Sequence, residues 1–193
     1  ITEPVDEIIA VGAQDRLEPV PVEGTVAYLS AGHAWVMRST STARRPLTTE
    51  GDLDSRVFEL SPDGRWLLYS RRLEGDAETP IHQLWMAITT IVGENPISTP
   101  IQGVLYAGWS PDGDQIAYST AERTPSAPGW RANNDLWLVQ PGAVFTDTQE
   151  SIAATQVISP STAGVYSWWG TTFEWSPDGR QVAYARPDQI GVV

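Results

Sequence analysis

The sequence predicts an all-β protein built from a repeated four-stranded unit. Three observations support this prediction. The phrase Ser-Pro-Asp-Gly occurs three times, at residues 61–64, 110–113 and 176–179. Each copy lies between two short apolar runs, which favours a strand on either side of a turn. A further apolar run follows, and its second position is Trp in three of four cases.

The Ser-Pro-Asp-Gly phrase has the chemistry of a tight turn. Proline fixes the backbone angle φ at the second turn position, and aspartate bonds back to nearby backbone N–H groups. Glycine adopts the left-handed conformation that follows, so each phrase predicts a hairpin. The structural turn residues are Asp63, Gly64, Asp112, Gly113, Asp178 and Gly179.

The strands of each unit follow in a fixed order around the turn. First strands are expected at 57–60, 106–109 and 172–175, and second strands at 66–70, 115–119 and 181–185. Third strands are expected at 34–37, 84–87, 136–139 and 190–193, and fourth strands at 45–48, 96–99 and 156–159. A degraded turn at 21–24 leads into an additional second strand at 25–30. Four strands per repeat are typical of β-propeller blades.

The repeats divide the chain into one propeller domain, residues 1–193, with about four blades. Their approximate bounds are 16–50, 55–102, 104–160 and 165–193. Residues 7–11 also have the pattern of a short strand. Two arrangements remain open: the chain is a fragment or incomplete ring of a larger propeller, or residues 1–15 supply the strand that closes a four-bladed ring.

Residues 109–118 and 134–139 carry a recognisable motif. They follow the order aromatic-Ser-Pro-Asp-Gly, two variable residues, Ile-Ala-Tyr, and then Asp-Leu-Trp-Leu-Val. This motif resembles the TolB-type, WD40-like propeller repeat over most of residues 16–193. The resemblance implies a bacterial, extracytoplasmic propeller, located in the periplasm or at the cell surface. The same repeat occurs in the propellers of prolyl-oligopeptidase-like enzymes, so it specifies the fold better than the function.

Composition excludes several functional classes. The formal charge of −12 argues against nucleic-acid or anionic-membrane partners, because both require a basic surface. No apolar stretch is long enough for a membrane span. The sequence has no Cys and no Lys, which excludes disulfides and Schiff-base chemistry in this chain. Two His without Cys make a zinc site improbable, and neither a metal nor a cofactor is expected.

No catalytic constellation emerges from the sequence. The chain has no Gly-x-Ser-x-Gly elbow, and its two His lie on well-separated repeats. The spacing of the 24 Asp and Glu residues recommends no carboxylate pair. The three turn aspartates have a full explanation as turn residues. We therefore expect no enzymatic activity in this chain.

Candidate binding residues are those that the repeat does not explain. Trp35, Trp85 and Trp137 recur on third strands and are assigned to the core between blades. In a four-stranded meander, the loops between second and third strands and the links between blades lie on the face opposite the Ser-Pro-Asp-Gly turns. We call this the loop face. The residues expected to form a binding site there are Trp130, Arg131, Tyr166, Trp168 and Trp169, with Arg71, Arg72 and His82 at its rim. The alternative is that these aromatics fold back and plug the ring.

Three functions are considered. The first is a non-catalytic binding or scaffolding propeller for a protein, peptide or polar polymer. The second is the propeller portion of a prolyl-oligopeptidase-like hydrolase whose catalytic domain lies outside this chain. The third is a carbohydrate-binding or carbohydrate-active propeller that uses exposed Trp side chains as stacking platforms.

Overall fold

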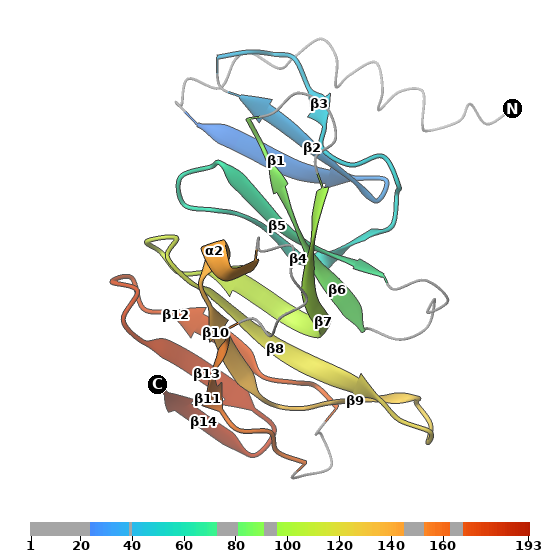
Figure 1. Ribbon diagram of the computed structural model, residues 1–193, viewed down its shortest axis with the longest axis vertical. Helices are drawn as coiled ribbons and strands as arrows, with labels where there is room; N and C mark the ends of the chain where they lie inside the picture. The colour runs from blue at the N-terminus through green and yellow to red at the C-terminus, as the bar shows by residue number, and fades with distance from the viewer. Residues whose placement is uncertain (1–23, 39, 73–80, 91–95, 145–152, 163–167) are drawn as a thin grey trace, which may run out of the picture.

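The computed structural model describes residues 24–38, 40–72, 81–90, 96–144, 153–162 and 168–193. These residues form an arc of antiparallel sheets, with the first sheet and the last at opposite ends of the molecule (Figure 1). The all-β propeller prediction is confirmed. The strand expected at residues 7–11, on which the four-bladed ring depends, lies outside the described residues.

The predicted strands occur in the predicted order, and β9 (Trp130–Ala132) is an additional strand in a stretch predicted as a loop. They are β1 (Thr25–Ser30), β2 (His33–Arg38), β3 (Arg45–Pro46), β4 (Leu53–Leu60), β5 (Trp66–Arg72), β6 (His82–Ile88), β7 (Pro96–Trp109), β8 (Ile116–Arg123), β9 (Trp130–Ala132), β10 (Leu136–Val139), β11 (Thr155–Ile158), β12 (Thr172–Trp175), β13 (Val182–Arg186) and β14 (Gln189–Val192). The helical segment of the described residues is the single turn α2 (Pro141–Val144).

The second and third blades share one continuous sheet. Its strand order is β11-β10-β8-β7-β6-β5-β4, and β9 extends β8 at one end. The 14-residue strand β7 links the two blades, because its first half pairs with β6 and its second half pairs with β8. The first and fourth blades are the separate sheets β1-β2-β3 and β12-β13-β14.

The three Ser-Pro-Asp-Gly turns have the same hydrogen bonds. In the first, Ser61 Oγ donates to Asp63 Oδ1 at 2.6 Å, and the Gly64 N–H donates to Ser61 O at 2.8 Å. The second and third turns repeat both contacts, with serine-to-aspartate distances of 2.6 Å. The hydrogen bond from the serine hydroxyl, and next the one from the backbone N–H two residues after each aspartate, lower the pKa of all three aspartates. Each turn glycine has a φ between 68° and 77°, which only glycine adopts without strain.

The turns of neighbouring blades lie side by side on one face. A Cβ atom on Gly113 would lie 3.5 Å from Pro62 Cδ, and one on Gly179 would lie 3.1 Å from Asp112 Oδ2. In Figure 1 these turns gather on the left, and β9 extends to the right. Trp130 and the segment before β12 are therefore at the opposite ends of their strands from the turns, as the loop-face geometry requires.

The core lies between blades rather than within one sheet. On β5, Leu67 packs in the cluster shared with the first blade, and Leu68 packs in the cluster shared with the third. On β8, Ile116 and Ala117 divide in the same way between the second and fourth blades. Alternate residues of a strand point to opposite faces, so a strand buried on both faces needs an apolar run without polar alternation.

The recurring Tyr and Trp lie opposite each other on second and third strands. Tyr118 pairs with Trp137, and the two rings stack with centroids 6.4 Å apart. The buried Asp135 carboxylate accepts hydrogen bonds from the Thr120 N–H and hydroxyl and from the Trp137 indole, at 2.6–2.8 Å. Burial and the charge of Asp135 raise the pKa of Tyr118 to about 12.

Loss of Asp135 should destabilise the third blade. Asp135→Ala removes the buried carboxylate, so the Thr120 N–H, the Thr120 hydroxyl and the Trp137 indole N–H lose their hydrogen-bond acceptor. We therefore expect the free energy of unfolding to fall by about 2–4 kcal/mol. Urea denaturation measures this loss. Asp114→Ala, at an exposed turn position, is the matched control and should change stability by less than about 0.5 kcal/mol. Equal effects of the two variants would contradict the role assigned to Asp135.

Candidate functional site

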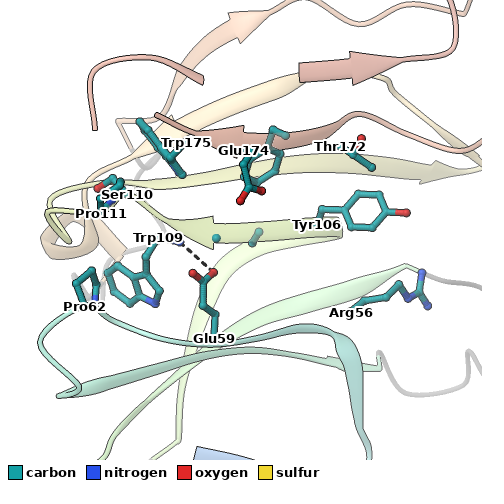
Figure 2. A pocket seen from close by; sticks show the side chains of 13 residues that line it. Arg56, Glu59, Pro62, Tyr106, Trp109, Ser110, Pro111, Thr172, Glu174 and Trp175 are labelled. Atoms are coloured by element: carbon teal, nitrogen blue, oxygen red, sulfur yellow. Dashed lines mark hydrogen bonds between the residues drawn. The ribbon is translucent and has the colours of Figure 1, made fainter. Parts of the chain in front are cut away.

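A pocket of about 420 Å³ lies between the first strands of the second, third and fourth blades. These strands are β4, the second half of β7, and β12, and Figure 2 shows their side chains around the pocket. The lining residues are Arg56, Glu59, Pro62, Tyr106, Ala107, Gly108, Trp109, Ser110, Pro111, Thr172, Phe173, Glu174 and Trp175. We call this the inner-strand pocket.

Glu59, Gly108 and Glu174 occupy one repeat position, two residues before the serine of each turn. The repeat therefore places two glutamates on either side of a glycine. A Cβ atom on Gly108 would lie 2.9 Å from Glu59 Oε2 and 3.7 Å from Phe173 Cε2. The missing side chain at Gly108 thus leaves the space into which the Glu59 carboxylate extends.

Glu59 is anchored to the neighbouring blade. Its Oε2 accepts a hydrogen bond from the Trp109 backbone N–H at 3.2 Å, drawn as the dashed line in Figure 2. The pocket walls desolvate the carboxylate, which raises the pKa of Glu59. The Trp109 hydrogen bond opposes this shift, and the nearby charge of Glu174 adds to it. Glu59 keeps an exposed surface, so its carboxylate remains accessible from solvent.

The charges of the pocket are distributed along its length. Glu59 and Glu174 lie toward the turn end of their strands, and Arg56 and Tyr106 lie toward the loop face (Figure 2). Such a pocket can bind a cation by charge and hydrogen bonding. The described residues contain no group of three or more His, Asp or Glu side chains placed to hold a metal ion.

On the loop face, Trp168 and Trp169 are exposed. Their side chains are 48 % and 56 % accessible, and their rings meet edge to face with centroids 5.2 Å apart. They precede Gly170, which is buried. A Cβ atom there would lie 2.8 Å from Leu105 Cδ1 and 3.6 Å from Tyr106 Cε2. Gly170 thus packs closely against Leu105 and Tyr106 of the third blade, directly after the Trp pair.

Trp130 and Arg131 lie on β9, at the loop-face end of the β8–β9 pair. Trp130 is half-buried against a cluster that includes Leu105 and Ala121. Arg131 is exposed and forms an ion pair with Glu122, directly opposite on β8. Trp130 therefore contributes to the core, and Arg131 has an acidic neighbour of its own.

The predicted rim residues have different surroundings. Arg71 forms ion pairs with Glu50 and Asp52, and its guanidinium lies 4.6 Å from the centre of the Trp85 ring. His82 is 2 % exposed, with its Nδ1 atom 3.4 Å from Ser70 Oγ.

Arg72 is exposed. Tyr166 lies outside the described residues. Arg71 and His82 are thus paired or buried inside the protein and do not form an exposed rim.

Solved structures with the same architecture identify the fold. A putative TolB from Agrobacterium tumefaciens aligns with 88 % of this chain and 53 % of its own, at 17 % identity and a TM-score of 0.54. TolB from Acinetobacter baumannii aligns over 88 % of this chain and 37 % of its own, at 14 % identity and a TM-score of 0.52. The fold is that of a TolB-like β-propeller.

Part of a peptidase also has this fold. Acylaminoacyl peptidase from Pyrococcus horikoshii aligns over 89 % of this chain and 28 % of its own, at 13 % identity and a TM-score of 0.54. The chain thus spans about half or less of the length of these neighbours. No family model and no curated protein matches the sequence. Among the described residues, no helix has the length and hydropathy of a membrane span.

Sequence reasoning missed the inner-strand pocket. The predicted binding site was built from residues of the loop face, and neither Glu59 nor Glu174 was among them. The available signal was the fixed spacing of Glu, Gly and Glu before the three turns. Residues at the same repeat position lie close together because the first strands of adjacent blades are neighbours. The spacing of carboxylates along the sequence does not show this proximity.

The raised pKa of Glu59 predicts a pH-dependent stability cost. Because the pKa of Glu59 is higher in the folded than in the unfolded protein, ionisation of Glu59 opposes folding. The stability cost is absent below the ordinary Glu pKa of about 4.3, where Glu59 is protonated in both states. It develops as the pH rises through the raised pKa of the folded protein. Glu59→Gln should therefore stabilise the protein at pH 8 and not at pH 4. Urea unfolding at both pH values measures the difference.

Glu122→Gln is the control for this comparison, because it removes a surface carboxylate that is ion-paired with Arg131. Losing an exposed ion pair should lower stability at pH 8 by at most about 1 kcal/mol. If Glu59→Gln gives the same loss as Glu122→Gln, or no gain at pH 8, Glu59 is not held at a stability cost.

Proposed function

We propose that this chain is a non-catalytic binding module that holds a protein or peptide partner on its loop face. The observation that supports this most directly is the exposed pair Trp168 and Trp169. Large aromatic side chains normally lose surface on folding, whereas this pair keeps about half of its surface in solvent. Tryptophan is among the residues that most often dominate binding energy at protein interfaces.

The position of the pair also favours binding. It projects from the link between the third and fourth blades, next to the buried and closely packed Gly170. A rigid scaffold that presents an aromatic anchor loses little conformational freedom when a partner binds. An extracytoplasmic location, as the TolB resemblance implies, is part of this proposal.

Site-specific photocrosslinking tests the loop face directly. A photoreactive residue at position 169 should capture a partner in the native cell, and one at Arg180, exposed beside the turn of the fourth blade, should not. With the captured partner purified, Trp168→Ala and Trp169→Ala should each weaken its Kd about 30-fold or more, equivalent to about 2 kcal/mol. Their melting temperatures should stay near that of the wild type.

The opposite pattern would contradict the assignment. If both variants lower the melting temperature by several degrees and leave the Kd unchanged, the Trp pair contributes to folding rather than to binding.

The similarity to acylaminoacyl peptidase supports a second candidate, the propeller portion of a peptidase. The product of the complete reading frame discriminates between the two. Hydrolysis of peptide substrates by that product, abolished by replacing a serine in a Gly-x-Ser-x-Gly elbow outside these residues, would favour the peptidase.

A further inference from the structure

We propose that the inner-strand pocket binds a small organic cation, a guanidinium or ammonium compound that also carries a carbonyl or hydroxyl oxygen. This inference is independent of the loop-face proposal, because it concerns a different set of residues on the first strands of the blades. The volume of the inner-strand pocket, about 420 Å³, lies within the range of small-molecule sites.

Two carboxylates supply the cation-binding end. Glu59 and Glu174 come from β4 and β12 and flank Gly108 on β7. In Figure 2 both carboxylates extend into the space between the strands. Two negative charges that share a partly desolvated pocket repel each other, and a bound cation would relieve that repulsion. Charge-assisted hydrogen bonds to a guanidinium or ammonium group are the stronger class of hydrogen bond.

The other lining residues favour an organic cation over a metal ion. Calcium requires six to eight oxygen ligands, whereas the pocket offers two carboxylates. Its lining also includes the aromatic residues Tyr106, Phe173 and Trp175. Aromatic faces attract guanidinium and alkylammonium groups through cation–π interactions and also bury their carbon atoms.

A buried donor points to an oxygen on the same ligand. Trp109 lines the pocket and is 5 % exposed, and its indole N–H has no hydrogen-bond partner among the described residues. In Figure 2 the indole nitrogen lies on the ring edge toward Glu59. A buried donor without an acceptor is costly, and a ligand oxygen at this end of the pocket would satisfy it. Arg56 lines the other end of the pocket, toward the loop face.

Isothermal titration with a matched pair of ligands tests the proposal. N-acetyl-L-arginine amide carries a guanidinium and two carbonyl oxygens, and N-acetyl-L-citrulline amide has nearly the same shape without the charge. At pH 8 the arginine compound should bind the wild-type protein with a measurable Kd, and the citrulline compound should bind at least about tenfold more weakly.

Variants assign the binding to the pocket. Glu59→Gln and Glu174→Gln should each weaken binding of the arginine compound about tenfold, and Glu122→Gln, which removes a carboxylate on β8 outside the pocket, should leave the Kd unchanged. The far-ultraviolet circular dichroism of each variant checks that the propeller is folded. If Glu59→Gln does not fold, the binding measurement with Glu174→Gln tests the pocket on its own.

Three results would overturn the proposal. They are absence of heat with the arginine compound at millimolar concentration, equal affinity for the two ligands, and equal effects of the pocket and control variants. None of these results bears on the Trp168 and Trp169 crosslinking experiment, so the two proposals fail separately.

Discussion

The packing of each blade against its neighbours is the constraint on which this structure depends. A single four-stranded sheet has two faces, and here both faces of an inner blade are apolar, as Leu67 and Leu68 show on β5. Neither face is buried unless a second sheet covers it, so the blades stabilise one another. The hydrogen-bonded Ser-Pro-Asp-Gly turns hold the first two strands of successive blades in the same register, which keeps the faces aligned.

Positions that depart from the repeat are therefore informative. Gly191 replaces the third-strand Trp of the other blades, and the Tyr184 ring fills the space, since a Cβ atom there would lie 2.8 Å from its hydroxyl. This departure is compensated within the blade. Gly108 is different, because the space beside it is occupied by the Glu59 carboxylate rather than by an apolar ring. Glycine at position 108 leaves room for the charged Glu59 carboxylate between two blades. A charge at this place opposes the apolar packing that stabilises the fold.

The sequence predicted the strands, their order and the turn face because each depends on local chemistry. Turn residues, β-rich runs and a repeated Trp are all readable within a few positions. The site was harder to predict because it depends on contacts between blades. Trp130 and Trp168 look alike in sequence, yet Trp130 packs beside Leu105 whereas Trp168 is exposed. His82 and Arg71 are polar residues that the blade itself buries or pairs.

In the proposed cation pocket, Glu59 is kept ionisable at a cost to stability. Measuring the pKa of Glu59 by NMR titration of its side-chain carboxyl carbon tests this most directly. We expect a pKa above the ordinary Glu value of about 4.3 in the free protein, and a lower pKa when N-acetyl-L-arginine amide is bound. A pKa at or below the ordinary value in the free protein, unchanged by the ligand, would contradict it.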